Sequence, residues 1–114
     1  MSVEVSNIDV TTLKALAEPN RLAIVELLRK SPLSVGEIAH QLDLSQPHTS
    51  KHLKVLSDSG IVRVKAEANR RIYNLRPEPF QSLASWIQTY QSIMEERFDQ
   101  LDDYLRELKE DGQV

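Results

Sequence analysis

The chain has 114 residues and no cysteine, and its 14 basic and 17 acidic side chains give a net charge of −3. Without cysteine there is no disulfide framework, no thiolate metal site and no cysteine nucleophile. The length suits one domain with its own core. The N-terminus has no apolar signal core and no stretch approaches the roughly 18 apolar residues of a membrane span. We therefore expect one cytoplasmic domain, residues 1–114, that contacts no membrane.

The charge is distributed unevenly along the chain. Residues 1–44 carry four basic and six acidic side chains, residues 45–76 carry seven and two, and residues 77–114 carry three and nine. A segment of net charge +5 inside an acidic protein is typical of an electrostatic footprint for nucleic acid. A chance cluster on a solvated surface is the alternative that charge alone leaves open.

Two helices are predicted in the first 30 residues. Asn7 or Asp9 can cap a short helix that carries Val10, Leu13, Leu16 and Ala17. Pro19 suits the first turn of a second helix, which should run to about Lys30 before Ser31-Pro32 ends it. The apolar stripe of this second helix is wide enough to be deeply buried, and it consists of Leu22, Ile24, Val25, Leu27 and Leu28.

Two short capped helices are predicted next. Ser34 and Glu37 form a capping box in front of a helix with Ile38, Ala39 and Leu42. After a turn at Asp43-Leu44, Ser45 is the candidate cap of a helix that should run to about Ser59, with Gly60 placed to end it. Residues 34–59 are thus predicted to form a helix-turn-helix unit.

The pattern then changes to a hairpin and a last helix. Residues 61–65 and 71–75 are rich in β-branched side chains, and Asn69 between them suits a turn, which predicts a β-wing over 61–76. Pro77 and Pro79 should close the hairpin. A long amphipathic stretch from about Phe80 to Leu108 predicts a helix over 79–110. The expected fold is mainly α with a β-hairpin wing (α+β), a winged helix-turn-helix of four helices, two strands and a fifth helix.

The helix that begins near Ser45 has two different faces. Thr49, Leu53 and Leu56 recur at i, i+4 and i+7 and should face the core. The opposite face is polar and positive, as a DNA major groove requires, and it carries Gln46, Pro47, Ser50, Lys51 and Lys54. Gln46 can pair with adenine, Lys51 can reach guanine or a phosphate, and Ser45 and Ser50 suit phosphates. A merely solvated helix face is the alternative, although serine and threonine are poor choices for one.

The hairpin supplies a second basic element. We expect four side chains to crowd its tip, namely Arg63, Lys65, Arg70 and Arg71. An arginine at a wing tip can enter a narrow minor groove, where the negative potential is strongest. Charge that protects an exposed edge ribbon from aggregation is the alternative, and it explains lysines better than paired arginines.

An ordered series of segments resembles the ArsR/SmtB family of bacterial winged-helix repressors. The segments are Leu16-Ala17-Glu18-Pro19-Asn20-Arg21-Leu22, Leu33-Ser34-Val35-Gly36-Glu37-Ile38-Ala39, Leu44-Ser45-Gln46 with Ser50-Lys51-His52-Leu53-Lys54-Val55-Leu56, and Ser59-Gly60-Ile61-Val62. The resemblance implies a homodimer that binds double-stranded DNA at an inverted-repeat operator and represses transcription until a signal relieves it.

The resemblance does not extend to the known metal sites of the family. Arsenic-sensing members carry paired cysteines where this chain has Ser34, Gly36 and Ala39, none of which can hold a soft metal. Zinc-sensing members place Asp and His ligands along the last helix, and residues 80–110 contain no histidine. We therefore expect no metal or other cofactor, and an unidentified small-molecule or protein effector stays open.

Three histidines remain, His40, His48 and His52. The spacing of His48 and His52 is one that two metal ligands on a helix can have. We interpret this pair differently, with one ring in contact with DNA or water and the other packed against the hairpin, so that both join the candidate DNA-binding set. The resemblance implies a DNA-side or structural role for His52. No histidine accompanies a serine and a carboxylate as nucleophilic catalysis requires, so we predict no catalytic residue and no enzyme.

The last helix carries an apolar stripe that one winged-helix body cannot cover. The stripe recurs at intervals of three and four, and at about 1.5 Å per residue the helix exceeds about 40 Å. An identical helix is the economical partner, and the expected dimerisation residues are Leu13, Leu83, Ile87, Tyr90, Met94, Phe98 and Leu101, with Trp86 beside them. A break near Gln91-Ser92, after which the helix folds back, is the alternative.

The remaining residues of the last helix are mostly acidic, and nothing marks a catalytic pocket there. We interpret this acidic run as a solvated face directed away from DNA. Because the total charge is acidic, a second class of function stays open: a winged-helix module that binds a partner protein through its long helix or its basic face.

Overall fold

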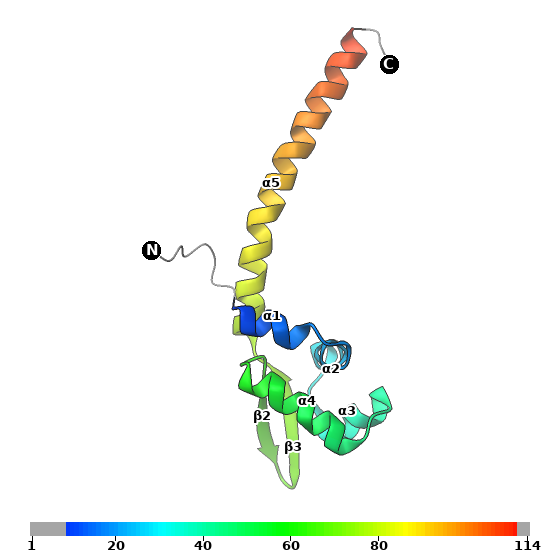
Figure 1. Cartoon of the computed structure of the whole chain (residues 1–114), viewed down its shortest axis with the longest axis vertical. Helices are drawn as coiled ribbons and strands as arrows, with labels where there is room; N and C mark the ends of the chain where they lie inside the picture. Colours follow the sequence, from blue (N-terminus) through cyan, green and yellow to red (C-terminus); the bar gives the residue numbers. More distant parts are fainter. Residues whose placement is uncertain (1–8, 112–114) are drawn as a thin grey trace, which may run out of the picture.

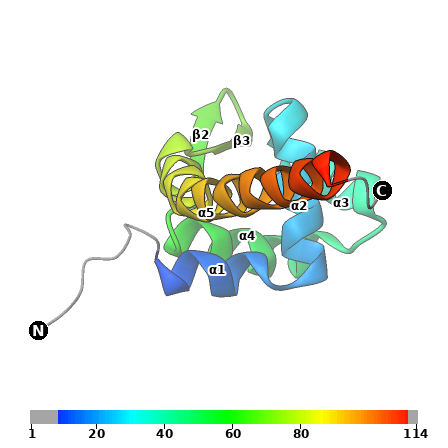
Figure 2. The ribbon, with the colours of Figure 1, turned by 90° about the horizontal axis from the view of Figure 1, so that it is seen from above.

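The computed structural model describes residues 9–111 of the chain. Within this range the elements are α1 (Val10–Leu16), α2 (Pro19–Lys30), β1 (Leu33–Ser34), α3 (Val35–Leu42), α4 (Gln46–Asp58), β2 (Val62–Glu67), β3 (Arg70–Leu75) and α5 (Pro77–Glu110). The first four helices and the sheet form a body, from which α5 rises as a long rod (Figure 1). Seen from above, α5 projects across the body while the wing of β2 and β3 extends to one side (Figure 2). The predicted winged helix-turn-helix fold is confirmed.

The helices of the body begin where local capping groups satisfy their free N–H groups. The Asp9 carboxylate accepts from the Thr11 amide at 2.9 Å at the start of α1, whereas the alternative cap, Asn7, lies outside the described residues. The Glu18 carboxylate accepts from the Arg21 amide at 2.9 Å, and Pro19 occupies the first turn of α2. The predicted start of α2 at residue 19 and its end at residue 30 are confirmed.

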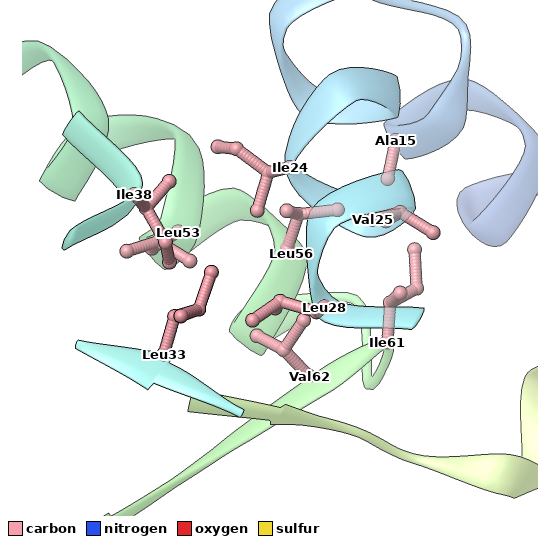
Figure 3. Packing of buried hydrophobic residues seen from close by; sticks show 10 residues of the cluster. All are labelled: Ala15, Ile24, Val25, Leu28, Leu33, Ile38, Leu53, Leu56, Ile61 and Val62. Atoms are coloured by element: carbon pink, nitrogen blue, oxygen red, sulfur yellow. The ribbon is translucent and has the colours of Figure 1, made fainter. Parts of the chain in front are cut away.

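The core of the body lies between α2, α4 and the base of the sheet. Ten hydrophobic residues form one buried cluster, drawn in Figure 3: Ala15, Ile24, Val25, Leu28, Leu33, Ile38, Leu53, Leu56, Ile61 and Val62. The stripe predicted for α2 is correct for Ile24, Val25 and Leu28, but Leu22 is 48% exposed. The prediction for Leu22 is wrong because the buried face of α2 is centred on Ile24, Val25 and Leu28, and Leu22 projects from a different side of the helix.

The helix-turn-helix forms as the capping signals predict. The Ser34 hydroxyl accepts from the Glu37 amide at 3.2 Å and the Glu37 carboxylate accepts from the Ser34 amide at 2.9 Å, so the capping box is confirmed. Asp43 takes a left-handed conformation at φ 55 between α3 and α4. The Ser45 hydroxyl accepts from the His48 amide at 3.2 Å, and Ser45 caps α4 as expected. Gly60 at φ 76 redirects the chain after α4, a conformation that costs glycine little.

The wing is a three-stranded antiparallel sheet in the order β1-β3-β2. The sequence did not predict β1, whose two residues pair with Tyr73 and Ile72 of β3. The predicted connection over residues 66–70 is wrong, since both strands continue to a turn at Ala68 and Asn69. Strand pairing therefore extends to Glu67 opposite Arg70, and Ala68 takes the left-handed conformation at φ 55 that the tight turn requires.

The last helix is longer than predicted and has no break. It runs without interruption from Pro77 to Glu110, so the alternative of a break near Gln91-Ser92 is wrong. Pro77 and Pro79 lie inside its first turn, where a missing N–H removes no helical hydrogen bond. No residue of α5 is buried, although Phe80 packs partly against the core of the body. Across residues 9–111, no helix has the length and apolar character to cross a membrane.

Candidate nucleic-acid interface

The two faces of α4 are separated as the sequence predicts. Thr49, Leu53 and Leu56 are buried, and they hold the helix against the core. The Thr49 hydroxyl donates to the Ser45 carbonyl at 2.9 Å, which satisfies this buried polar group within the helix. The opposite face is exposed and comprises Ser45, Gln46, Pro47, His48, Ser50, Lys51 and Lys54. Lys54 pairs with Asp58 at 3.3 Å, whereas none of the ion pairs in the described range includes Lys51.

A groove between α4 and the wing brings part of the predicted site together. It encloses about 350 Å³ and is lined on the α4 side by Ser50, Lys54 and their neighbours. Arg71 and Tyr73 of β3 and Val64 of β2 line the other side. Because side chains alternate between the faces of a strand, Arg71 and Tyr73 project to the same face of β3. Two cations and a hydroxyl, from Lys54, Arg71 and Ser50, thus face one groove, which the Asp58 carboxylate, paired with Lys54, also lines. The two cations and the hydroxyl suit a phosphate backbone.

The other basic residues of the wing lie elsewhere. Arg63 pairs with Asn74 and Lys65 with Ile72, so both project from the face of the ribbon opposite Arg71. The pKa of Glu78 is lowered first by its own backbone amide, then by Arg76, and most weakly by the charge of Arg63, which lies near the base of the hairpin. The expectation that four basic side chains crowd the tip is therefore wrong, and only Arg70 and Arg71 flank it. The strands are longer than predicted, which places Arg63 five residues before the turn.

The wing is anchored to α3 by Arg70. Its guanidinium donates to the Glu37 carboxylate at 2.6 Å, and the two side chains are about half exposed. Pairing of Ser34 with Ile72 holds the same two elements together through the backbone. The Ser34 backbone amide, the Ser34 hydroxyl and the Arg70 charge together hold the pKa of Glu37 below its ordinary value. The wing is therefore positioned relative to the helix-turn-helix before any partner binds, which lowers the entropic cost of binding.

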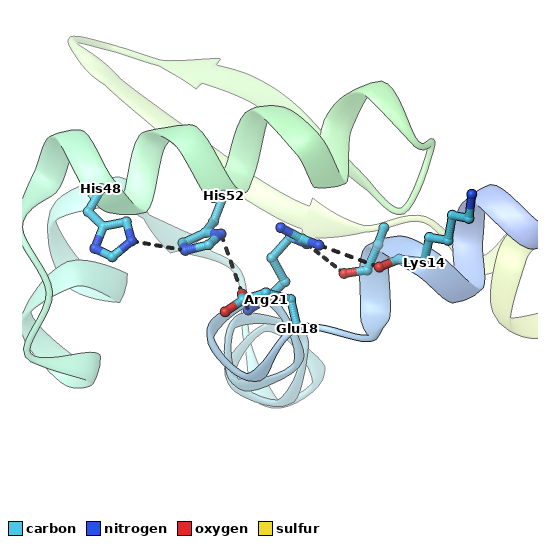
Figure 4. Close-up of polar contacts among 6 residues, drawn as sticks. Lys14, Glu18, Arg21, His48 and His52 are labelled. Atoms are coloured by element: carbon cyan, nitrogen blue, oxygen red, sulfur yellow. Dashed lines mark hydrogen bonds and ion pairs between the residues drawn. The ribbon is translucent and has the colours of Figure 1, made fainter.

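A chain of polar contacts joins α4 to the start of α2 (Figure 4). The Nδ1 atom of His52 lies 3.5 Å from the Glu18 carboxylate, and its Nε2 atom lies 3.2 Å from Nε2 of His48. The side chain of His52 is only 13% exposed. Its ring points toward Glu18 and not toward the hairpin, so the predicted hairpin packing is wrong. His52 is held as a structural residue, whereas His48 is exposed beside the other exposed polar residues of α4.

Glu18 and Arg21 connect these polar contacts to α1. Partial burial raises the pKa of Glu18, but the Arg21 and Asn20 amides and the nearby charges of His52 and Arg21 outweigh it, and the pKa lies below its ordinary value. The Arg21 guanidinium in turn donates to the Ala15 carbonyl of α1 at 2.6 Å. The ionised Glu18 therefore caps α2 and orients the His52 ring at the same time. Within residues 9–111, no group of three or more acidic or histidine side chains is arranged to hold a metal ion.

The predicted dimerisation residues divide into two groups. Leu13 of α1 and Leu83 of α5 are partly buried. The others project from α5 into open space, and they are Ile87, Tyr90, Met94, Phe98 and Leu101. Leu105 is equally exposed, and it belongs to the apolar stripe that the sequence predicts for α5, which consists of Phe80, Leu83, Ile87, Tyr90, Met94, Phe98, Leu101, Leu105 and Leu108. Ile93 and Tyr104 are exposed as well and were not predicted as part of this surface.

Sequence reasoning missed the roles of Glu18 and Glu37. The sequence predicts Glu37 only as a helix cap, and its partner Arg70 lies 33 residues away. Glu18 is visible in the sequence as part of a motif, and its contact with His52 joins two helices. A carboxylate at a helix start is a signal for capping, but the second partner of each carboxylate follows from tertiary packing.

Comparison with known proteins places the chain in a family. Residues 18–64 match the sequence model of the bacterial regulatory protein, arsR family. The chain is 47% identical over 64 residues to the HTH-type transcriptional regulator Rv2034 of Mycobacterium tuberculosis, covering 56% of this chain and 60% of that protein. It is 43% identical over 63 residues to the biofilm growth-associated repressor of Agrobacterium fabrum, covering 55% and 54%. The chain thus spans somewhat more than half the length of the curated relatives that it matches.

Solved structures agree with this result. The crystal structure of the ArsR family transcriptional regulator RHA00566 is 31% identical with a TM-score of 0.65, and the match covers 75% of this chain and 89% of that one. The homodimeric winged helix-turn-helix DNA-binding domain of Mb0332 from Mycobacterium bovis is 25% identical with a TM-score of 0.59, covering 80% and 82%. From its motifs, its fold and these matches, the chain belongs to the ArsR family of bacterial transcriptional regulators.

Proposed function

We propose that this protein is a homodimeric transcriptional repressor that binds an inverted-repeat DNA operator. In each subunit, α4 lies in a major groove and the wing crosses the adjacent minor groove. The observation that carries this proposal is the shared groove, in which Ser50 and Lys54 of α4 face Arg71 of the wing. A two-fold dimer would read half-sites roughly one helical turn apart.

The proposed DNA contacts follow from the geometry of the site. Gln46 and Lys51 on the exposed first turns of α4 are the candidates for reading bases, because side chains near the start of a recognition helix reach deepest into the groove. Ser45, Ser50, Lys54 and Arg71 are the candidates for phosphates. Arg70 is half exposed beside the turn and is the candidate for the minor groove. To bind there, its guanidinium must leave the Glu37 carboxylate and contact the DNA instead.

The signal that releases DNA is not a metal ion bound at the thiolate site or at the α5 site of the metal-sensing family members. Ser34, Gly36 and Ala39 offer no soft ligand, and residues 80–110 contain no histidine. We expect Zn²⁺ and arsenite to leave the DNA affinity of this protein unchanged. A several-fold loss of affinity with either ion, measured by fluorescence anisotropy, would contradict this part of the proposal.

The central test is the salt dependence of DNA binding. Fluorescence anisotropy with DNA from the protein's own upstream region should show affinity that falls steeply as salt rises, because a basic footprint releases counterions. Lys51→Ala and Arg71→Ala should weaken binding, and each should reduce the slope of log affinity against log salt by about 1. Lys109→Ala and Arg106→Ala, which remove the same charges far along α5, are the matched controls.

The outcome also separates the proposal from its main alternative. Gln46→Ala should relax base preference at one position, by about 1–3 kcal/mol. If no DNA sequence is preferred and affinity is insensitive to salt, the protein is not a DNA-binding repressor. That result would favour the second candidate, a winged-helix module that docks a partner protein through its long helix or its basic face.

A further inference from the structure

The contact between His48 and His52 restricts where the protons of both rings lie. The two Nε2 atoms are 3.2 Å apart, so one of them donates an N–H and the other accepts with its lone pair. On the other side of the His52 ring, Nδ1 faces the ionised Glu18 carboxylate at 3.5 Å, and the ring is only 13% exposed. A carboxylate attracts an N–H and repels a lone pair. Nδ1 of His52 therefore carries a proton.

The count of protons then decides the state of the last nitrogen, Nδ1 of His48. Two neutral rings hold one proton each. One of these protons lies on Nδ1 of His52 and the other is shared between the two Nε2 atoms, so Nδ1 of His48 has none and is an acceptor. A further proton can enter the intact chain of contacts only at Nδ1 of His48, which then becomes a donor. This result does not depend on which of the two rings carries the positive charge.

This last nitrogen lies on the exposed part of α4. His48 is exposed and is the third residue after the Ser45 cap, in the first turn of the helix. The two nitrogens of its ring diverge, so Nδ1 is directed away from His52 (Figure 4). Among residues 9–111, no group other than His52 forms a hydrogen bond with the His48 ring. In the proposed function, on which this inference rests, side chains of this turn meet base edges in the major groove.

We propose that His48 reads a base through Nδ1, and that uptake of one proton by the histidine pair reverses its base preference. As an acceptor, Nδ1 binds the exocyclic amino group of cytosine or adenine. As a donor, it binds N7 or O6 of guanine or O4 of thymine. The reversal is sharpest between cytosine, which offers only a donor in the major groove, and guanine, which offers only acceptors. Glu18 and His52 touch no base in this arrangement, and they are positioning residues that hold His48 in one tautomer.

The charged groups around the pair leave the two histidines as the groups that change charge. The pKa of Glu18 lies below its ordinary value, so Glu18 stays ionised over the range in which histidine titrates, about pH 5–8. The Arg21 guanidinium beside it binds carbonyls at the end of α1, that of Lys14 among them at 3.4 Å. Lys51 lies between the two histidines along α4. Arginine and lysine keep their charge over this range, so a base preference that changes with pH reports on the pair.

The positions of the protons are tested first, without DNA. Proton–nitrogen correlation spectra of isotope-labelled protein distinguish a protonated from an unprotonated imidazole nitrogen, and His48→Gln and His52→Gln assign the two rings. At about pH 8, Nδ1 should be protonated in His52 and unprotonated in His48, and Nδ1 of His48 should gain its proton towards about pH 6. A protonated Nδ1 in His48 or an unprotonated Nδ1 in His52 at the higher pH would overturn the inference.

Base reading is tested by selecting bound sequences from a random pool of double-stranded DNA at about pH 8 and about pH 6. The relative affinity for cytosine against guanine should reverse at one position, by several-fold, and His48→Ala should remove the preference there at both pH values. His52→Leu should reduce the cytosine preference several-fold at the higher pH, because the His48 ring is then free to take either tautomer. His40→Gln, which replaces the exposed histidine of α3, is the control and should keep the full change.

The outcomes separate this inference from the proposed function. If the natural protein prefers the same bases at both pH values, or if the change survives His48→Ala, His48 does not read DNA in this way and the inference is wrong. Both of these results leave sequence-specific binding in place. If no sequence is enriched at either pH, the proposed DNA-binding function fails as well. Circular dichroism checks the fold of every variant, and His52→Gln takes the place of His52→Leu if the latter has lost helical signal.

Discussion

The body of this protein and its last helix use apolar residues in opposite ways. In the body, Ile24, Ile38 and Leu56 are fully buried within one chain. In α5, an apolar stripe of comparable size stays open, with Phe98 59% exposed. Because burial of apolar area is the main source of folding stability, the body is stabilised by its own contacts. The stripe of α5 gains this stabilisation only when a partner covers it, so stability and assembly are assigned to different regions.

The largest expected effect is a loss of core packing in the body. Leu56→Ala should lower the free energy of unfolding by about 2–5 kcal/mol, since Leu56 is fully buried and its loss leaves a cavity. Urea denaturation monitored through hydrogen exchange of the α2 amides reports on the body alone. Leu101→Ala is the matched change in α5, and at concentrations where the chain is monomeric it should not alter the stability of the body. Equal losses from both variants would mean that body and helix unfold as one unit.

A charge at the centre of the α5 stripe should act on assembly and not on folding. In the proposed homodimer, Met94→Glu removes the burial of two half-exposed methionines, about 1–1.5 kcal/mol each, and places a charge on each apolar stripe. The dimer dissociation constant should rise on the order of 30- to 150-fold, as analytical ultracentrifugation can measure. DNA affinity should fall with it, because each subunit then binds one half-site. Glu96→Gln on the polar face is the control, and a dimer that withstands Met94→Glu would contradict the role given to the stripe.

The smallest expected effect concerns the contact between the wing and α3. The pKa of Glu37 lies below its ordinary value of 4.5, since Ser34 and Arg70 stabilise its charged form. A lowered folded-state pKa means that this contribution to stability is complete above pH 4.5 and is lost as the pH falls through the folded-state value. Urea midpoints measured from neutral pH into this range should therefore decline less steeply for Glu37→Gln than for the natural protein. Identical pH dependence of the two proteins would show that this contact does not stabilise the wing.

Much of the body follows from local signals. Capping groups at Asp9, Ser34 and Ser45 start helices where predicted, because an N-cap needs only residues within three positions. The inward face of α4 follows from helical periodicity for the same reason. The strands of the hairpin are longer than the sequence predicts, since no glycine marks the turn and Ala68 adopts a left-handed conformation that its residue type disfavours.

The composition of the proposed DNA face was predictable, but its arrangement was not. The sequence identified the basic residues of the wing, whereas strand register decided that Arg71 shares a groove with Lys54 and that Arg63 and Lys65 project from the other face. A shift of one residue in register would reverse that assignment. The partners of Glu18 and Glu37 are likewise distant in sequence, since His52 and Arg70 reach them only after α4 and the wing pack against the body.

By itself, the sequence determined the order of the five helices and the hairpin, the family and the polar face of α4, because each depends on residues that are neighbours along the chain or form contiguous motifs. Only the tertiary structure decided the continuity of α5, the pairing of β1 with the wing and the two carboxylate contacts. These features depend on which surfaces come into contact once the core has packed. The local conformational preferences of each segment do not specify those contacts. The exposed stripe of α5 belongs to both groups. Its spacing is in the sequence, and its lack of cover is visible only in the folded chain.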